Sequence, residues 1–215
     1  MSGDGDRLVY ACAMGVEERI ARKLGPTVRV GLGAANAVPA VGRLVSFGIA
    51  GALDPELEIG TVIDATRVVD EAGSVLWEGP PLGVRSARSG TILGASRIVD
   101  RPEERERLRE ASGADAVDME SGPLARTGRL AGCIRAISDT PTRELAGLAE
   151  GAKANGDVDY VGLVRGFLRA PLATARAAGD ARRALKRLAE ASLAMPTQSR
   201  GGFAAAPSNP GADDR

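Results

Sequence analysis

Residues 114–126 read ADAVDMESGPLAR, and they place two acids where an apolar run stops. The run predicts a strand at 115–119 that ends around Asp118, and Glu120 falls where a helix can begin. Each acid alone is explained as an ordinary cap or first-turn residue of that helix. The stretch therefore predicts a strand-to-helix junction with a carboxyl group on each side of Met119.

A second junction of this kind follows at the end of the next predicted strand. That strand, 132–138, runs into ISDTP (137–141), where Asp139 lies beside Ser138. Open α/β sheets bind ligands at the carboxyl ends of their strands, and two neighbouring strands that end in acids bring carboxyl groups to that edge. We therefore favour a binding site over two unrelated helix caps.

Short β-rich runs alternate with helix-like ones along the chain, which predicts an α/β fold with a largely parallel sheet. Strands are predicted at 8–13, 27–32, 43–50, 61–69, 90–96, 115–119 and 132–138, and helices at 16–24, about 34–42, 103–112 and 120–130. The helix at 103–112 is expected to be solvated, with Leu108 and Ala111 on one buried edge.

The chain is expected to form one domain at residues 1–195. Within it, 157–195 is a basic helical region broken at Pro171, and 196–215 is rich in Pro, Gly, Ser and Ala and is expected to be disordered. The basic region has two interpretations. It is a solvated face packed on the sheet, or it makes peripheral contact with an anionic membrane surface.

The composition excludes several classes of function. Lysine plus arginine and aspartate plus glutamate both total 28 among 215 residues, so no overall positive field would attract nucleic acid. The chain has no histidine, which excludes Ser-His-Asp triads and leaves acid–base chemistry chiefly to carboxyl groups. Cys12 and Cys133 lie in separate apolar stretches, as free thiols in a reducing compartment do, although one disulfide stays open. With no signal peptide or membrane span visible, a cytoplasmic protein with a small-molecule partner is expected.

Two glycine loops follow predicted strands. GLGAAN (31–36) resembles part of a dinucleotide-binding fingerprint, but Asn36 replaces the third glycine and Asp54, at the distance of a ribose-binding acid, falls in a turn. Dinucleotide binding therefore ranks low. GIAG (48–51) is the second loop, and together the two loops favour a ligand that approaches main-chain N–H groups over simple tight turns.

Five motifs together resemble the nucleoside phosphorylase and nucleosidase superfamily. They are AMGVEE (13–18), GLGAANA (31–37), FGIAGALDPELEIGTVI (47–63), AVDMES (116–121) and RAISDTP (135–141), in the family's order along about two-thirds of the chain. The resemblance implies a three-layer α/β/α fold with a mixed, partly barrel-like central sheet, a homo-oligomer, a nucleoside substrate, and no metal or organic cofactor.

The resemblance also implies roles for individual residues. Glu120 would bind the ribose hydroxyls, Met119 would line the sugar pocket and Asp118 would support them. Asp139 would protonate the departing purine at N7, and Glu17 matches the glutamate that activates water in hydrolytic members. Further substrate-binding positions are Ser138, Ala50, Gly51, Arg97 and Ile98, where Arg97 replaces the aromatic residue that usually stacks on adenine in nucleosidases.

The chain's C-terminal part, 159–191, is similar to that of the hopanoid-associated phosphorylases. This implies phosphorolysis of a lipid-linked nucleoside, adenosylhopane, which releases adenine and a phosphoribosyl-hopane with inorganic phosphate as co-substrate. Gly48, Ile49 and Arg43 would then lie near the phosphate. Ser46 stands where hexameric phosphorylases have arginine, so a nucleosidase that uses water is the alternative.

Overall fold

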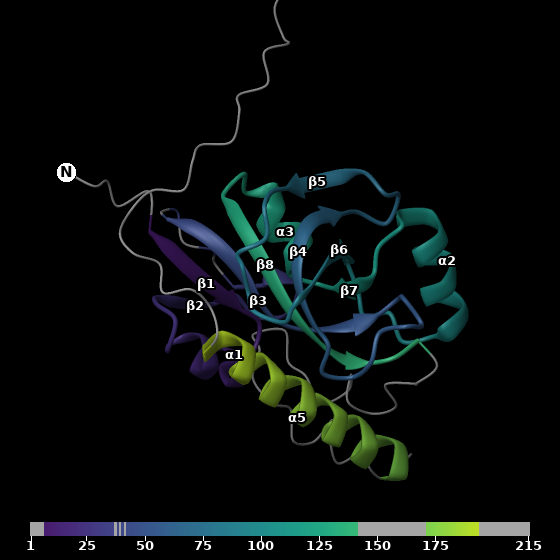
Figure 1. Ribbon diagram of the computed structural model, residues 1–215. Helices are drawn as coiled ribbons and strands as arrows, with labels where there is room; N and C mark the ends of the chain where they lie inside the picture. Colours follow the sequence, from purple (N-terminus) through teal and green to yellow (C-terminus); the bar gives the residue numbers. More distant parts are fainter. Residues whose placement is uncertain (1–6, 37, 39, 41, 142–170, 194–215) are drawn as a thin grey trace, which may run out of the picture.

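The computed structural model describes residues 7–36, 38, 40, 42–141 and 171–193 (Figure 1). Its elements are β1 (Leu8–Cys12), α1 (Gly15–Ala21), β2 (Thr27–Arg29), the 3₁₀ turn η2 (Leu32–Ala34), β3 (Arg43–Ala52), β4 (Val62–Val69), β5 (Val75–Glu78), β6 (Arg88–Gly94), α2 (Pro102–Ser112), β7 (Ala116–Asp118), α3 (Ser121–Arg126), β8 (Leu130–Asp139) and α5 (Pro171–Leu193). The predicted helical stretch before Pro171 and the tail at 196–215 lie outside the described residues.

Five strands close into a barrel-like ring. β3 pairs with β7, β7 with β6, β6 with β4, β4 with β8, and β8 again with β3. β1 and β2 extend the sheet from β3, and β5 adds to β4. Five of these pairings are parallel, as the expectation of a largely parallel sheet requires. The other three are antiparallel, β3 with β7, β4 with β5 and β4 with β8, which confirms the mixed, partly barrel-like sheet.

Helices cover the sheet on both sides, as the three-layer expectation requires (Figure 1). α5 lies beside α1 and packs on β8 and β3, where its Ala184 and Leu188 are fully buried in one apolar cluster with Phe47. α3 packs on β6 and places Leu124 in a second cluster. No helix in the described part of the chain is both long and apolar enough to cross a membrane.

The expected helix near 34–42 is wrong for the residues described there. Gly33 and Ala34 have positive φ angles of 62° and 55°, so the chain leaves the helical region after one 3₁₀ turn. The N–H group of Gly33 instead donates to the Glu120 carboxyl, 87 residues away in sequence. A hydrogen bond to a residue distant in sequence thus takes the place of the helical hydrogen bonds expected here.

Two further elements differ from expectation. β5, a four-residue edge strand, was not predicted, because its short sequence VLWE has no clear alternation of apolar residues. In α2, Leu108 is buried as expected but Ala111 is exposed, and Glu104 and the completely buried Arg105 join Leu108 in the interior. The helix therefore buries a cation that the hydrophobic pattern does not show.

Candidate active site

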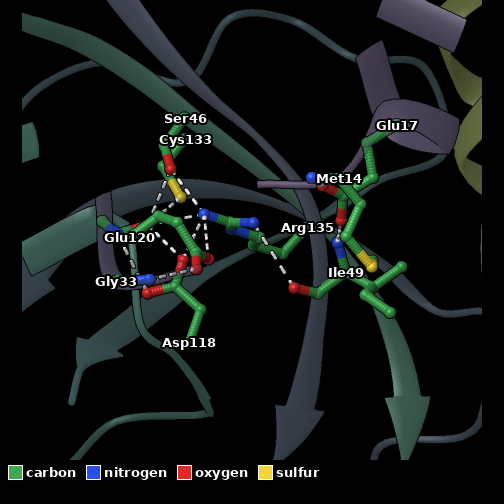
Figure 2. Close-up of polar contacts among 10 residues, drawn as sticks. Met14, Glu17, Gly33, Ser46, Ile49, Asp118, Glu120, Cys133 and Arg135 are labelled. Atoms are coloured by element: carbon green, nitrogen blue, oxygen red, sulfur yellow. Dashed lines mark hydrogen bonds and ion pairs between the residues drawn. The ribbon is translucent and has the colours of Figure 1, made fainter. Parts of the chain in front are cut away.

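A buried arginine, Arg135 of β8, lies at the centre of the candidate site (Figure 2). Only 1% of its surface is exposed, and its guanidinium contacts the Asp118 carboxylate and lies 3.6 Å from Oε2 of Glu120. A buried cation is stable only when anions and hydrogen-bond acceptors surround it. Arg135 had no predicted role, although it is the single charged residue within the apolar strand GCIRAIS and therefore requires a partner.

Glu120 is held between Arg135 and the first glycine loop. Its Oε1 accepts the N–H of Gly33 at 2.9 Å, and the same loop brings Gly33 close to the Met119 side chain. Burial, together with the nearby charges of Asp118 and Glu17, raises the pKa of Glu120 to about 7 against the opposing effects of Arg135 and the Gly33 N–H group. Near neutral pH this carboxyl is therefore divided between its protonated and ionised forms.

Asp118 ties Arg135 to the start of α3. One of its oxygens accepts the N–H of Ser121 at 3.1 Å, and the other contacts both the Ser121 hydroxyl and the Arg135 guanidinium. The Ser121 hydroxyl also lies 3.0 Å from that of Ser46 and 3.1 Å from the thiol of Cys133. Both cysteines of the chain are free and buried, so the open question of a disulfide is answered.

Glu17 approaches Arg135 from the opposite side to Glu120 (Figure 2). It lies in the first turn of α1 with 1% of its surface exposed, and its two oxygens accept the N–H groups of Met14 (2.9 Å) and Ile49 (3.0 Å). Burial raises the pKa of Glu17, while Arg135 and the two N–H groups oppose that rise.

Gly48 provides the space in which Glu17 and Arg135 meet. A Cβ atom at this position would lie 2.4 Å from Oε1 of Glu17 and 2.6 Å from Nη1 of Arg135, both shorter than real contacts allow. The requirement is for volume, because the backbone of Gly48 is not in the left-handed region. The prediction of a glycine loop at 48–51 is therefore wrong, because these residues belong to β3. Gly48 instead makes room for a carboxyl group and a guanidinium.

Asp139 lies apart from this cluster. It pairs in register with Gly51, and its carboxyl lies 2.9 Å from the position that a Cβ atom of Gly51 would take. The guanidinium of Arg135 lies next to the Cβ position of Gly48 instead. Because successive residues of a strand point to opposite faces, positions 48 and 51 of β3 face different sides of the sheet. The structure therefore does not bring Asp139 against Glu120.

The Asp139 carboxyl is held on the side of the sheet that α2 covers. One oxygen contacts the guanidinium of Arg105, and the other accepts the Ser138 hydroxyl at 2.8 Å. The Ser138 hydroxyl is also 3.2 Å from the carbonyl oxygen of Ala50. The one-residue register shift between Ala50 and Gly51 in their pairing with β8 turns Asp139 to this face.

The remaining predicted positions are scattered. Arg97 is exposed and contacts Glu104 of α2, while the neighbouring Ile98 is 37% exposed. Arg43 begins β3, five residues before Gly48, which places its backbone roughly 16 Å away along the strand. The structure thus does not bring Arg43 to Gly48.

Two other features lie outside the carboxyl cluster. Asp54, the ribose-binding acid of the dinucleotide hypothesis, pairs with Arg88 (3.2 Å) and Arg109 (2.9 Å). A cavity of about 520 Å³ opens between α5 and the first residues of β4 and β6, and no predicted site residue lines it. Arg187 and Glu190 on its wall pair with each other, and Glu58, Arg85 and Arg88 also line it.

Comparisons with known proteins agree with this fold and with the motifs at 116–121 and 135–141. Residues 78–161, which include Asp118, Glu120, Arg135 and Asp139, match the family described as the phosphorylase superfamily. No curated protein sequence matches the chain. The predicted resemblance to the nucleoside phosphorylase and nucleosidase superfamily is confirmed, whereas closeness to its hopanoid-associated members stays a prediction.

Solved structures show the same fold at low sequence identity. A mutant 5′-methylthioadenosine nucleosidase of Helicobacter pylori with 5′-methylthioadenosine in its active site is 17% identical, with a TM-score of 0.52, over 86% of this chain and 99% of that one. Futalosine hydrolase of the same organism is 16% identical with a TM-score of 0.55, over 88% and 97%. A 5′-methylthioadenosine/S-adenosylhomocysteine nucleosidase of Colwellia psychrerythraea in complex with adenine is 15% identical with a TM-score of 0.55, over 86% and 96%.

Proposed function

We propose that the protein cleaves the N-glycosidic bond of a purine nucleoside and uses water as the nucleophile. The superfamily match and the nucleosidase fold support glycosidic cleavage. The arrangement around Arg135 supports water. Glu17 and Glu120 lie on either side of this guanidinium, so one carboxyl is available for the nucleophile and the other for the sugar (Figure 2).

The proposed reaction uses each carboxyl group once. Water attacks the anomeric carbon while the bond to the purine nitrogen breaks and its electron pair leaves with the base. Glu17 accepts the proton of the water, because each of its oxygens accepts one backbone N–H and keeps a second lone pair. Glu120 binds the ribose hydroxyls and stabilises the positive charge that develops on the sugar. The chemistry requires no metal or organic cofactor.

Asp139 is assigned to the base. The departing purine needs a proton at N7, and a positioned acid contributes typically ~10²–10⁴-fold in rate. Its carboxyl lies on the α2 side of the sheet together with Arg97 and Ile98, the positions expected to hold the base. A single nucleoside can reach both groups only if it lies across the carboxyl ends of β3 and β8. We therefore place its sugar at the Arg135 cluster and its base beyond the end of β8, next to Asp139.

The surroundings of Gly48 are the observation that favours water over phosphate. The N–H of Ile49, which a phosphate would need, is bound by the Glu17 carboxyl at 3.0 Å. Arg135, the cation that faces Gly48 in the described part of the chain, already has Asp118, Glu120 and Glu17 around it. A phosphate dianion placed there would meet three carboxyl groups, and like charges in a buried site repel strongly.

Phosphorolysis of a lipid-linked nucleoside is the second candidate. The similarity of 159–191 to hopanoid-associated phosphorylases favours this reaction. Among the predicted phosphate-binding residues, Arg43 is the least suitable because it begins β3, far from Gly48. If phosphate binds, its ligands must include groups other than Ile49 N–H and Arg43.

The test is to incubate methylthioadenosine and adenosylhopane separately with the protein while phosphate is titrated. We expect adenine release that does not change with phosphate, and a free sugar as the second product. Formation of a sugar 1-phosphate would overturn the hydrolytic proposal. Glu17→Gln should lower release by ~10²–10⁴-fold, whereas the matched Glu106→Gln, at an exposed position on α2, should leave it unchanged.

A further inference from the structure

Arg105 of α2 is buried completely, with no exposed surface, in a helix whose other arginines are at the surface or partly buried. Four hydrogen bonds to backbone carbonyl oxygens and one ion pair hold its guanidinium. Nε and Nη2 donate to the carbonyl oxygen of Val99 at 3.0 and 2.9 Å, Nη1 donates to those of Ala52 (3.3 Å) and Thr140 (3.2 Å), and Nη2 also contacts Asp139. Such a fixed fork orients its partners more strictly than a lysine ammonium would.

These contacts join three separate segments of chain. Ala52 is the last residue of β3, Thr140 follows β8, and Val99 belongs to the loop that contains Arg97 and Ile98. The residue before Arg105, Glu104, holds the same loop a second time through its contact with Arg97. One turn of α2 therefore fixes the loop expected to hold the base against the acid expected to protonate it.

We propose that Arg105 is a positioning residue for the leaving group, which sets the geometry between the Asp139 carboxyl and the loop 97–99. This inference rests on the proposed glycosidic cleavage and specifies which half of the reaction Arg105 serves. Arg105 does not contact the sugar cluster, whose carboxyl groups surround Arg135 instead. Its loss should therefore affect departure of the base and leave attack at the sugar largely intact.

A pair of substrates separates these two halves. Methylthioadenosine needs a proton on its departing base, whereas 4-nitrophenyl β-D-ribofuranoside releases a nitrophenolate that leaves without one. The variants are Arg105→Met, which removes the guanidinium, and Arg105→Lys, which keeps the charge but loses the fork. Arg107→Met is the control, because Arg107 lies on the same helix with 72% of its side chain exposed.

We expect Arg105→Met to lower kcat on methylthioadenosine by roughly 100-fold, the cost of a misplaced catalytic group, and to change kcat on the nitrophenyl riboside by less than about threefold. On methylthioadenosine, Arg105→Lys should have a kcat between those of Arg105→Met and the wild type. If Arg105→Met does not fold, Arg105→Lys provides the test. Equal losses on both substrates, or no loss on either, would overturn the proposal.

Calorimetric titration with adenine tests the same role without turnover. We expect Arg105→Lys to bind adenine about tenfold more weakly than the wild type and Arg107→Met to bind it equally well. If the wild-type protein cleaves neither substrate, the proposed function fails. The adenine titration then still decides whether Arg105 organises a base site, and unchanged adenine affinity in Arg105→Lys would count against it.

Discussion

Glu120 shows how strongly burial changes one residue. Its pKa of about 7 in the folded protein lies above the 4.5 of an unperturbed glutamate. Between these two pH values the folded state holds a proton that the unfolded state has released, so this group lowers the free energy of unfolding as pH rises. The loss is complete above the folded pKa and is on the order of 3 kcal/mol, at about 1.4 kcal/mol per pKa unit.

Glu120→Gln should remove this pH dependence, because the amide has a similar shape and does not ionise. We expect the variant to gain stability relative to the wild type between pH 5 and pH 8, measured as the change in the urea unfolding midpoint at each pH. Glu103→Gln, at an exposed position on α2, is the control and should show no such gain. A difference between Glu120→Gln and wild type that is the same at both pH values would contradict the assignment.

Asp139 carries the second prediction at this scale. Asp139→Asn should lower adenine release by ~10²–10⁴-fold because the amide cannot supply a proton to the base. The fold should survive with lower stability, because Arg105 loses its anionic partner but keeps its four hydrogen bonds to carbonyl oxygens. Release should be followed by adenine absorbance and folding by circular dichroism. A variant that turns over normally would exclude Asp139 as the acid.

Among the elements, α3 and β6 approach each other through two glycines. A Cβ at Gly94 would lie 2.4 Å from backbone atoms of Gly122, and backbone cannot move aside as a flexible side chain can. This contact seats α3, and with it the Asp118–Ser121 hydrogen bonds that hold Arg135. We expect Gly94→Ala to lower the free energy of unfolding by about 1–3 kcal/mol or more, as overpacking of a core does.

The opposite result is expected for a glycine within a helix. Gly179 of α5 is exposed and has nothing within 4 Å of its Cβ position. Gly179→Ala should raise stability by about 0.5–1 kcal/mol through lower conformational entropy of the unfolded chain. Urea unfolding of both variants measures the two changes in stability. A Gly94→Ala variant as stable as the wild type would show that the close approach of Gly94 and Gly122 does not require glycine.

For the whole molecule, the distribution of charge on α5 gives the remaining prediction. Ala184 and Leu188 face the sheet, and the exposed positions on this helix include Arg176, Arg182, Arg183, Lys186 and Arg187. Arg183, Lys186 and Arg187 lie near Asp180 or Glu190, which reduces the net positive charge of this surface. Any membrane contact should therefore be weak and electrostatic.

We expect the protein to co-sediment with anionic vesicles at low salt and to be released at high salt, because the Debye length falls from about 30 Å at 0.01 M to about 3 Å at 1 M. The double variant Arg182→Glu and Lys186→Glu should abolish sedimentation, while neutral vesicles serve as the control. Background sedimentation of the wild type with anionic vesicles at low salt would leave α5 as a solvated cover of the sheet.

The α/β class and most strand and helix positions can be predicted from the sequence, because hydrophobic periodicity is a local property of the chain. The roles of Glu17, Asp118, Glu120 and Asp139 stay predictions, which the sequence makes through family resemblance. It also implied a mixed sheet through family resemblance. The prediction of a helix at 34–42 was wrong because the N–H group of Gly33 donates to Glu120, a partner distant in sequence that no local pattern predicts.

Which of these residues contact one another depends on the tertiary structure. Arg135 and Arg105 are the two buried cations that contact the carboxyl groups. The strand register places Asp139 with Arg105 on one face of β3 and Glu120 with Arg135 on the other. Desolvation and ion pairing depend on distances between segments far apart in sequence. For that reason the identity of the charged partners, and the division of the site into a sugar end and a proposed base end, follow from packing and not from sequence pattern.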